Sequence, residues 1–257
     1  MSEHWYKNGV LADQRHADWP KTKAGTPRVS PPKAMMVALG FKPSGTSILS
    51  VVGGAGGLLN WYAKMGMQAC LNVGREKLGW KEELKKLTSA AAEEGTRFHK
   101  CIEEYLSGYN LPEDAPAKSA CINVHNWITS RKLTGGRKEH IVELEEHPLG
   151  REIPYAGTVD YWIEKEGELW VIDIKTKNTA KDCRPEWAHV AQCTAYAHAI
   201  DSQKKVEDVR CVNLYISRET GELGKAKVWT EKEMEIGMEL FGHASWVWKT
   251  MNTNKIT

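Results

Sequence analysis

Two aspartates and a lysine lie on what the sequence predicts to be a single β-hairpin. Residues 157–176 contain two runs in which Val, Ile, Tyr and Trp alternate with polar residues, separated by Glu166-Gly167. Such alternation is typical of half-buried strands. If the chain turns at Glu166-Gly167, Asp160 and Asp173 face each other across the hairpin, and Lys175 lies on the same side as Asp173. The opposite side then pairs only apolar residues, including Val159 with Ile174.

Two facing carboxylates need compensating positive charge. On paired strands their side chains lie about 5 Å apart and repel each other. Lys175 supplies one charge, and a hard divalent ion such as Mg²⁺ or Mn²⁺, which prefers oxygen ligands, would supply more. We therefore expect metal-dependent chemistry at this hairpin. The alternative is a surface face whose Asp–Lys contacts contribute little to stability.

Three other segments carry polar residues at informative spacings. They are Gly95-Thr96-Arg97-Phe98-His99-Lys100-Cys101-Ile102-Glu103, Gln192-x-x-x-Tyr196, and Pro43-Ser44-Gly45-Thr46-Ser47-Ile48-Leu49-Ser50. On a helix, residues four apart share a face, as His99 and Glu103 would, and likewise Gln192 and Tyr196. Each segment also has a purely structural explanation: solvated or packed helix residues in the first two, and a helix N-cap in the third.

Taken together, the four segments resemble a known nuclease family. Gly157-x-x-Asp160 followed by Asp173-Ile174-Lys175-Thr176 is similar to the G-x-x-D…(D/E)-x-K core of the PD-(D/E)XK nuclease superfamily, and the D-x-K-T form resembles its RecB-like exonuclease branch. The other segments resemble, in the same order, the P-S-x-T-x-I-L-S motif of phage and mitochondrial genome-maintenance exonucleases, the G-T-x-x-H-x-x-I-E helix and the Q-x-x-x-Y helix. The resemblance covers residues 43–217.

The resemblance implies a catalytic set. Asp160, Asp173, the carbonyl of Ile174 and His99 would bind one or two Mg²⁺ or Mn²⁺ ions. Lys175 would hold or activate the attacking water and stabilise charge that grows on the phosphate. Hydrolysis by in-line attack would leave a free 5′-phosphate.

It also implies supporting residues. Glu103 would orient His99 or contact the metal through water. Gln192 and Tyr196 would support the site and approach the nucleic-acid backbone. Ser44 and Thr46 would bind phosphate at a helix N-terminus. Glu143 is a weaker acidic candidate, with an outward charge on an edge strand as its alternative role.

The elements that must position these residues point to an α/β (α+β) fold. Helical patterns cover 58–71, 80–107 (as one helix or two, the second capped by Thr88 or Ser89), 119–133, 185–201 and 231–250, the last opened by a Thr230-x-x-Glu233 capping box. Strand patterns cover 140–146, 153–164, 168–176 and 207–217. We expect a restriction-endonuclease-like core, a mixed central sheet flanked by helices, with a helical N-terminal extension.

The expected organisation is a short arm followed by one domain. Residues 1–42, rich in Pro, Lys and Thr, predict an irregular basic arm that is either mobile or wrapped on the domain. Residues 43–257 would form the nuclease domain, with a helical part at 43–135 and the catalytic sheet core at 136–257. Trp5, Trp19 and Trp61 lie in the basic region, where aromatic rings could stack on single-stranded DNA.

Composition narrows the class of protein. The 257 residues are 41% hydrophobic and 26% charged, which excludes disordered and collagen-like chains. The longest apolar runs fall short of the roughly 18 residues of a membrane span. There is no secretion signal at the start, and the six cysteines form no C-x-x-C pair. We therefore expect a cytoplasmic protein, in a bacterial host if phage-encoded, without a membrane partner or an iron–sulfur cluster.

The formal net charge of +2 conceals an uneven distribution. Residues 1–87 carry a net charge of +7 and the remainder is acidic. The basic third could guide the DNA backbone toward an acidic metal site, which predicts salt-sensitive binding.

The expected function is that of a metal-dependent DNA exonuclease acting on single- or double-stranded ends of linear DNA, in phage DNA recombination, repair or processing. A recombination or single-strand-binding protein is the expected kind of partner. Two alternatives stay open: a structure- or sequence-specific endonuclease with the same core, and a non-catalytic nucleic-acid-binding module. Oligomeric state is also left open.

Overall fold

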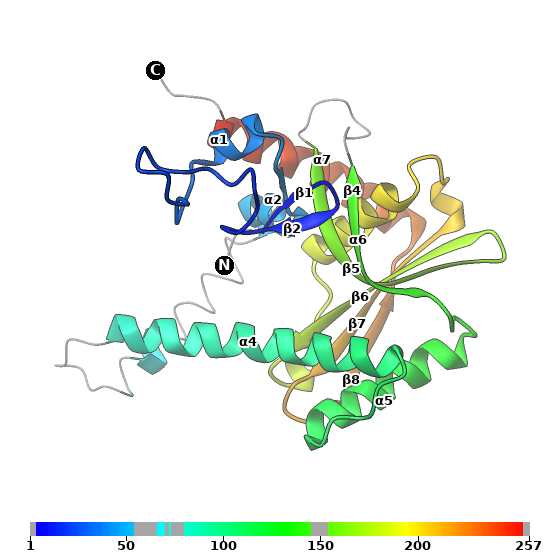
Figure 1. Cartoon of the computed structure of the whole chain (residues 1–257). Helices are drawn as coiled ribbons and strands as arrows, with labels where there is room; N and C mark the ends of the chain where they lie inside the picture. The colour runs from blue at the N-terminus through cyan, green and yellow to red at the C-terminus, as the bar shows by residue number, and fades with distance from the viewer. Residues whose placement is uncertain (1–3, 54–65, 70–71, 73–79, 145–153, 254–257) are drawn as a thin grey trace.

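A five-stranded mixed sheet forms the centre of the computed structural model, which describes residues 4–53, 66–69, 72, 80–144 and 154–253 (Figure 1). The strand order is β4-β5-β6-β7-β8. Strands β6 and β7 run parallel and the other neighbours antiparallel. The strands are β4 (Arg137–Leu144), β5 (Tyr155–Lys165), β6 (Glu168–Lys177), β7 (Val209–Ser217) and β8 (Leu223–Val228). The mixed sheet with helices on both faces confirms the predicted α/β class.

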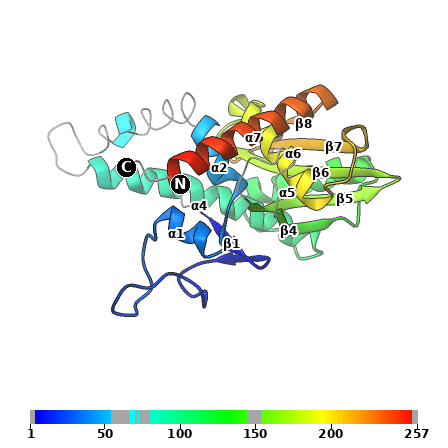
Figure 2. The same ribbon diagram turned by 90° about the horizontal axis from the view of Figure 1, so that it is seen from above.

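Helices cover both faces of this sheet. Helices α4 (Trp80–Leu106) and α5 (Ala115–Ser130) pack on one face, and α6 (Trp187–Ile200) packs on the other. Helix α7 (Glu231–Thr253) runs beside α6, and α2 (Gly45–Gly53) contacts both, as the view from above shows (Figure 2). Two short 3-10 turns, η1 (Ala180–Asp182) and η2 (Val206–Asp208), flank α6 along the chain.

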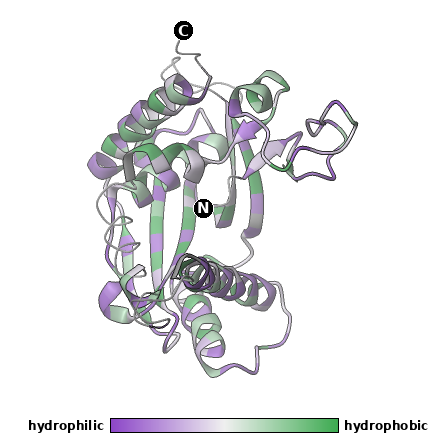
Figure 3. Cartoon of the chain, turned by 90° about the vertical axis from the view of Figure 1, so that its left-hand side faces the viewer, coloured by the Kyte–Doolittle hydropathy of each residue, from purple (hydrophilic) through white to green (hydrophobic). Residues whose placement is uncertain are grey.

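The central strands are apolar on both faces because both faces are covered. On β6, Ile172 and Ile174 belong to the cluster under α4 and α5, whereas Leu169 and Val171 belong to the cluster under α6. Figure 3 shows the apolar stretches of the strands lying between the two helical layers. The sheet is therefore a rigid interior platform, and polar side chains on it need specific partners.

The element boundaries agree with most of the predicted ranges. The capping box of α7 is present: Thr230 Oγ1 accepts the Glu233 N–H at 3.2 Å and Glu233 Oε2 accepts the Thr230 N–H at 2.9 Å. Residues 80–106 form one continuous helix, so the predicted cap at Thr88 or Ser89 is wrong. Strand β8 is not predicted by the sequence pattern, because this edge strand is only partly buried and alternates weakly.

The N-terminal region is more ordered than its composition predicts. It forms a three-stranded sheet, β2-β1-β3, and helix α1, with β1 (Trp5–Lys7), β2 (Val10–Ala12), α1 (Lys33–Ala38) and β3 (Lys42–Pro43). The expectation of an irregular arm over 1–42 is corrected in favour of a wrapped extension. Trp5 and Trp19 are buried in a cluster with α7, and the rings of Trp5 and Trp248 lie 6.0 Å apart, edge to face. These two tryptophans therefore serve packing, not base stacking.

Some predictions fall outside the described residues. They are Trp61 and the helix predicted at 58–71, of which residues 66–69 are described and helical. Within the described part of the chain, no helix has the length and apolar character needed to cross a membrane.

Candidate active site

The predicted hairpin register is confirmed up to the site. Strands β5 and β6 pair from Lys165 with Glu168 to Tyr161 with Ile172. Asp160 and Asp173 lie just beyond the last pair, where the two strands separate, so they are not the directly facing pair that the extended register predicts. At this point the Ile174 N–H donates to a side chain of β5 and not to its backbone: Asp160 Oδ2 accepts it at 2.6 Å.

The separation of the strands also redistributes the side chains. Val159 packs in the cluster under α6, whereas Ile174 packs in the cluster under α4 and α5. The single apolar face predicted to contain both residues is therefore wrong at this end of the hairpin. The same divergence lets Asp160 reach α4 while Asp173 reaches β7 and Lys175 reaches α6.

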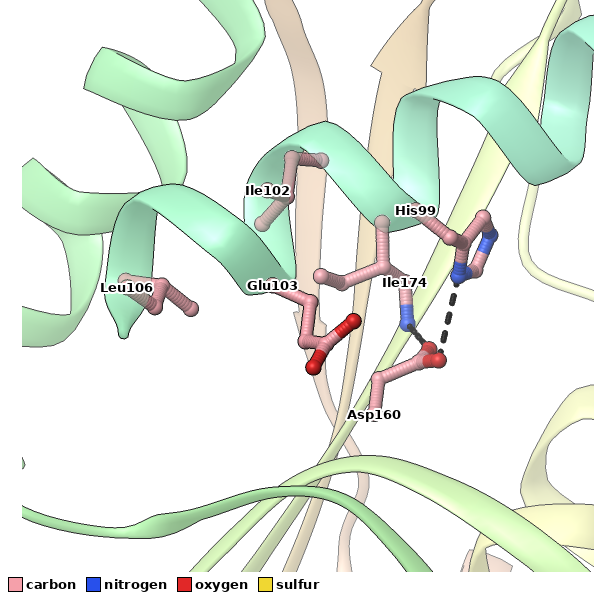
Figure 4. A pocket seen from close by; sticks show the side chains of 6 residues that line it. All are labelled: His99, Ile102, Glu103, Leu106, Asp160 and Ile174. Carbon is pink, nitrogen blue, oxygen red and sulfur yellow. Dashed lines mark hydrogen bonds and ion pairs between the residues drawn. The ribbon is translucent and has the colours of Figure 1, made fainter. Parts of the chain in front are cut away.

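Asp160 lies against α4 at a small pocket. His99 Nδ1 is 3.0 Å from Asp160 Oδ1. The pocket is lined by His99, Ile102, Glu103, Leu106, Asp160 and Ile174. Figure 4 shows His99 and Glu103 projecting from the same side of α4, with the Glu103 carboxylate pointing toward the space beside Asp160. The helical spacing of His99 and Glu103 thus brings both side chains to the first aspartate.

Asp173 and Lys175 belong to a hydrogen-bonded chain on the α6 side. Lys175 Nζ donates to Asp173 Oδ1 at 3.0 Å and to Gln192 Oε1 at 2.9 Å. Gln192 Nε2 in turn donates to the Tyr196 hydroxyl at 2.8 Å. Three of the four sequence segments therefore meet through direct contacts. The lysine is fixed between an acidic residue and an amide.

The electrostatics of the first aspartate favour an ion pair. Burial opposes the charged form of Asp160, but the charge and hydrogen bond of His99, together with the Ile174 N–H, outweigh it and lower the pKa of Asp160. Burial would likewise lower the pKa of His99, but Asp160 more than compensates and raises it. Both shifts act in the direction of a charged Asp160 beside a protonated His99.

The pKa of the second aspartate, Asp173, shifts in the opposite direction. Burial raises the pKa of Asp173, with Lys175 opposing this effect and Asp160 adding to it. Burial alone would lower the pKa of Lys175, but Asp173 and Asp160 raise it, so the lysine stays protonated. The Asp173 side chain is only 4% exposed. Additional positive charge at this place would relieve the cost of ionising it.

Glycines in two of the segments make room for residues of neighbouring segments. A β-carbon on Gly157 would collide with the ring of Tyr196. A β-carbon on Gly95 would lie 3.2 Å from Thr176 Oγ1, a tight contact between α4 and the end of β6. The glycines of the G-x-x-D and G-T-x-x-H segments are thus explained by close approach of α6 and α4 to the sheet.

The N-terminal extension also reaches the site. Ser44 Oγ accepts the Ser47 N–H at 3.0 Å, which makes Ser44 the N-cap of α2, and Thr46 is exposed beside it. A β-carbon on Gly45 would lie 3.6 Å from the Tyr196 ring. The Tyr6 hydroxyl lies 3.2 Å from Thr158 Oγ1, two residues before Asp160. The start of α2 therefore borders the hydrogen-bonded chain that contains Lys175.

The comparison with known families covers the three segments that meet through direct contacts. The PD-(D/E)XK nuclease superfamily model matches residues 74–240, which include His99, both aspartates, Lys175 and Tyr196. The chain belongs to this superfamily. No curated protein sequence matches it.

Two solved structures resemble the PD-(D/E)XK chain in part. One is the crystal structure of a "Putative exonuclease" from Eubacterium rectale, with 11% identity, a TM-score of 0.45, and coverage of 63% of this chain and 69% of that one. The other is the crystal structure of SSO0001, with 17% identity, a TM-score of 0.30, and coverage of 57% and 82%. The assignment to the superfamily rests on the match to the family model.

The donor set of this PD-(D/E)XK site fits a hard divalent ion. Asp160 and Asp173 offer carboxylate oxygens, the residue directly after Asp173, Ile174, offers a backbone carbonyl, and His99 offers an imidazole nitrogen. In the conformation of the described residues, no three His, Cys, Asp or Glu side chains form a closed ligand cage. Asp160 holds His99 and the Ile174 N–H, so ion binding would exchange these contacts for metal–ligand bonds.

Two pairs of buried, hydrogen-bonded residues near the PD-(D/E)XK site were not predicted as site residues. Asn213 Nδ2 donates to Asp173 Oδ2 at 2.6 Å, and Asn213 Oδ1 accepts from Trp229 Nε1 at 2.6 Å. His189 Nδ1 lies 2.8 Å from the Tyr215 hydroxyl. The sequence does contain a signal for Asn213: asparagine is a poor strand former, yet it lies inside the apolar run Val212-Asn213-Leu214.

Proposed function

We propose that the chain is a Mg²⁺- or Mn²⁺-dependent DNA exonuclease that hydrolyses phosphodiester bonds and leaves 5′-phosphates. The observation that carries the proposal is that Asp160 and Asp173 both lie where β5 and β6 separate, with His99 Nδ1 3.0 Å from Asp160 and Lys175 Nζ 2.8 Å from Asp173. Membership of a nuclease superfamily supports a nucleic-acid substrate.

The proposed roles follow from the contacts. Asp160, Asp173, the Ile174 carbonyl and His99 would hold the ion, which supplies Lewis-acid activation of the phosphate and of water when bound. Lys175 is held at 2.9 Å by Gln192 and stays protonated, so it would hold the attacking water and stabilise negative charge on the phosphate.

The surrounding residues would bind and orient the DNA backbone. Tyr196 and Gln192 fix the position of Lys175. Ser44 and Thr46, at the start of α2 next to Tyr196, offer hydroxyl groups and a helix N-terminus to a phosphate. Glu103 would act on the ion through water from its place beside Asp160. The +7 charge of residues 1–87 favours salt-sensitive DNA binding.

The motifs that resemble the RecB-like branch support action at the ends of linear DNA, single- or double-stranded. They also support a role in phage DNA recombination, repair or processing, alongside a recombination or single-strand-binding protein. In that setting the enzyme would work in the cytoplasm of a bacterial host, without an iron–sulfur cluster.

The experiment that tests this function compares two DNA substrates. End-labelled linear DNA and covalently closed circular DNA are each incubated with the protein and Mn²⁺. We expect degradation of the linear form alone. Nicking of the circle would show an endonuclease instead, and no cleavage of either form, with binding retained, would show a nucleic-acid-binding module.

Matched variants assign the activity to the site. Asp173→Ala and Lys175→Ala should abolish cleavage and leave DNA binding largely intact. Lys165→Ala is the control, because this lysine lies on the same hairpin but at its far end, where it contacts the Lys132 carbonyl. Normal cleavage by a folded Asp173→Ala protein would contradict the site assignment.

A further inference from the structure

Asp173 has a buried amide partner that is itself held in one orientation. Asn213 lies directly beside Asp173 in the parallel pairing of β6 and β7 and is fully buried. Its Nδ2 donates to Asp173 Oδ2 at 2.6 Å and contacts the Asp173 carbonyl at 3.3 Å. Its Oδ1 accepts from Trp229 Nε1 at 2.6 Å. The three residues therefore form a linear relay, Trp229–Asn213–Asp173.

The chemistry of the indole determines the direction of this relay. A tryptophan side chain can only donate a hydrogen bond. The amide oxygen of Asn213 must therefore face Trp229, and its NH₂ group must face the carboxylate. Without the indole N–H, the amide could turn over and present its oxygen to Asp173, an arrangement that repels an ionised carboxylate.

Trp229 is well placed to impose this orientation. It is 6% exposed, its backbone N–H donates to the Cys211 carbonyl at 3.0 Å, and Lys227 lies over its ring at 4.8 Å from the centroid. The next residue, Thr230, opens the capping box of α7. The indole is thus fixed by β7, β8 and the start of α7, and it does not contact Asp173 among the hydrogen bonds of the described residues.

We propose that Trp229 and Asn213 are positioning residues that hold the Asp173 carboxylate in the orientation that a divalent cation requires, and so set the affinity of the site for that cation. The inference rests on the proposed function, in which Asp173 is a metal ligand. Asn213 donates to Oδ2 while Lys175 contacts both oxygens, so the plane of the carboxylate is fixed from two sides. Groups that orient a ligand in this way typically change metal affinity 10- to 100-fold when removed.

The test measures Mn²⁺ binding to the full chain by calorimetry in the absence of DNA. Trp229→Phe and Asn213→Ala should each weaken Mn²⁺ binding by roughly 10-fold or more. The double variant should bind Mn²⁺ no more weakly than Asn213→Ala alone, because the indole acts through the amide. If Asn213→Ala does not fold, Asn213→Ser, which keeps a small polar group, replaces it in the cycle.

A second buried tryptophan provides a control that distinguishes the loss of the relay from the loss of packing. Trp127 is also 6% exposed, and its indole N–H has no hydrogen-bond partner among the described residues. Trp127→Phe should lower the melting temperature through the loss of packing, but leave Mn²⁺ affinity unchanged. Wild-type Mn²⁺ affinity in Trp229→Phe, or additive losses in the double variant, would overturn the relay.

Asp173→Asn distinguishes the failure of the relay from the failure of the proposed function. If Asp173→Asn binds Mn²⁺ as tightly as wild type, Asp173 is not a metal ligand and the proposed function fails with the relay. If Asp173→Asn loses Mn²⁺ binding while Trp229→Phe retains it, the metal site stands and the relay alone is overturned.

Discussion

The ring of Tyr196 occupies the space where a β-carbon of residue 157 would lie, so only glycine fits there. We expect Gly157→Ala to displace Tyr196 and, through Gln192, Lys175. Overpacking of this kind costs about 1–3 kcal/mol of stability. Urea unfolding measures the loss of stability, and the linear-DNA assay measures the loss of cleavage. The cleavage rate should fall even under conditions in which the variant is fully folded.

Gly66→Ala provides the control for that change. A β-carbon on Gly66 meets nothing within 4 Å. The stability and the cleavage rate of the Gly66→Ala protein should stay at wild-type values. If Gly157→Ala behaves in the same way, the packing of Tyr196 against the G-x-x-D segment does not position the lysine.

Removing His99 should change the metal requirement more than the fold. His99→Ala takes away the nitrogen that lies 3.0 Å from Asp160 and one of the donors proposed for the ion. We expect the Mn²⁺ concentration for half-maximal cleavage to rise roughly tenfold or more. His125→Ala, on α5 beside Tyr105, is the control. A metal titration of His99→Ala that superimposes on wild type would leave His99 with a structural role only.

The buried His189 should make the fold sensitive to acid. Burial lowers the pKa of His189 to about 2, with Lys175 and Lys177 adding to the effect. The unfolded chain therefore binds a proton near pH 6.5 that the folded chain does not bind. Stability should fall as the pH drops below about 6.5, by up to roughly 1.4 kcal/mol per pH unit from this group.

His189→Gln tests this pH dependence, because glutamine is polar but does not titrate. Urea unfolding between pH 4.5 and 7 should give a shallower slope for the variant than for wild type. Equal slopes would show that His189 takes up its proton without unfolding, in spite of its contact with Tyr215.

An ion pair fastens the N-terminal extension to the sheet. Lys42 Nζ lies 2.9 Å from Glu143 Oε2, and the side chains are 9% and 19% exposed. The Gly9 N–H also donates to Glu143. Lys42→Met leaves the carboxylate without the lysine charge, and we expect a loss of about 3 kcal/mol and faster proteolysis between residues 4 and 43.

The double variant Lys42→Met/Glu143→Gln should regain much of that stability, because it removes both charges. Limited proteolysis with mass spectrometry locates the cuts. Unchanged cleavage of the extension in Lys42→Met would show that the apolar cluster around Trp5 holds it without the ion pair.

The hairpin and its chemistry could be predicted from the sequence because both are local. The alternation of residues 157–176 allows one register only, since a slip by one residue would move every apolar side chain to the wrong face. That register is correct as far as Tyr161 and Ile172. It does not extend to the aspartates, where Asp160 contacts His99 of α4 and accepts the Ile174 N–H, contacts that the hairpin pattern does not contain.

The parts that could not be predicted depend on long-range contacts. The N-terminal segment lacks a period of its own, and its strands exist because Trp5 and Trp19 find a surface on α7. The relay to Asp173 needs Asn213 on one strand and Trp229 before α7 to meet in space. Neither of these two contacts joins residues at a regular spacing, so a sequence pattern cannot predict it.

The contact between Trp5 and Trp248 has a consequence for how the protein is made. During synthesis β1 leaves the ribosome before α7, because Trp5 precedes Trp248 by 243 residues in the chain. The apolar side chains of the N-terminal extension must therefore stay exposed until α7 is complete. Contacts of such sequence separation form slowly, so we expect this cluster to close last and to be the region most prone to aggregation in the nascent chain.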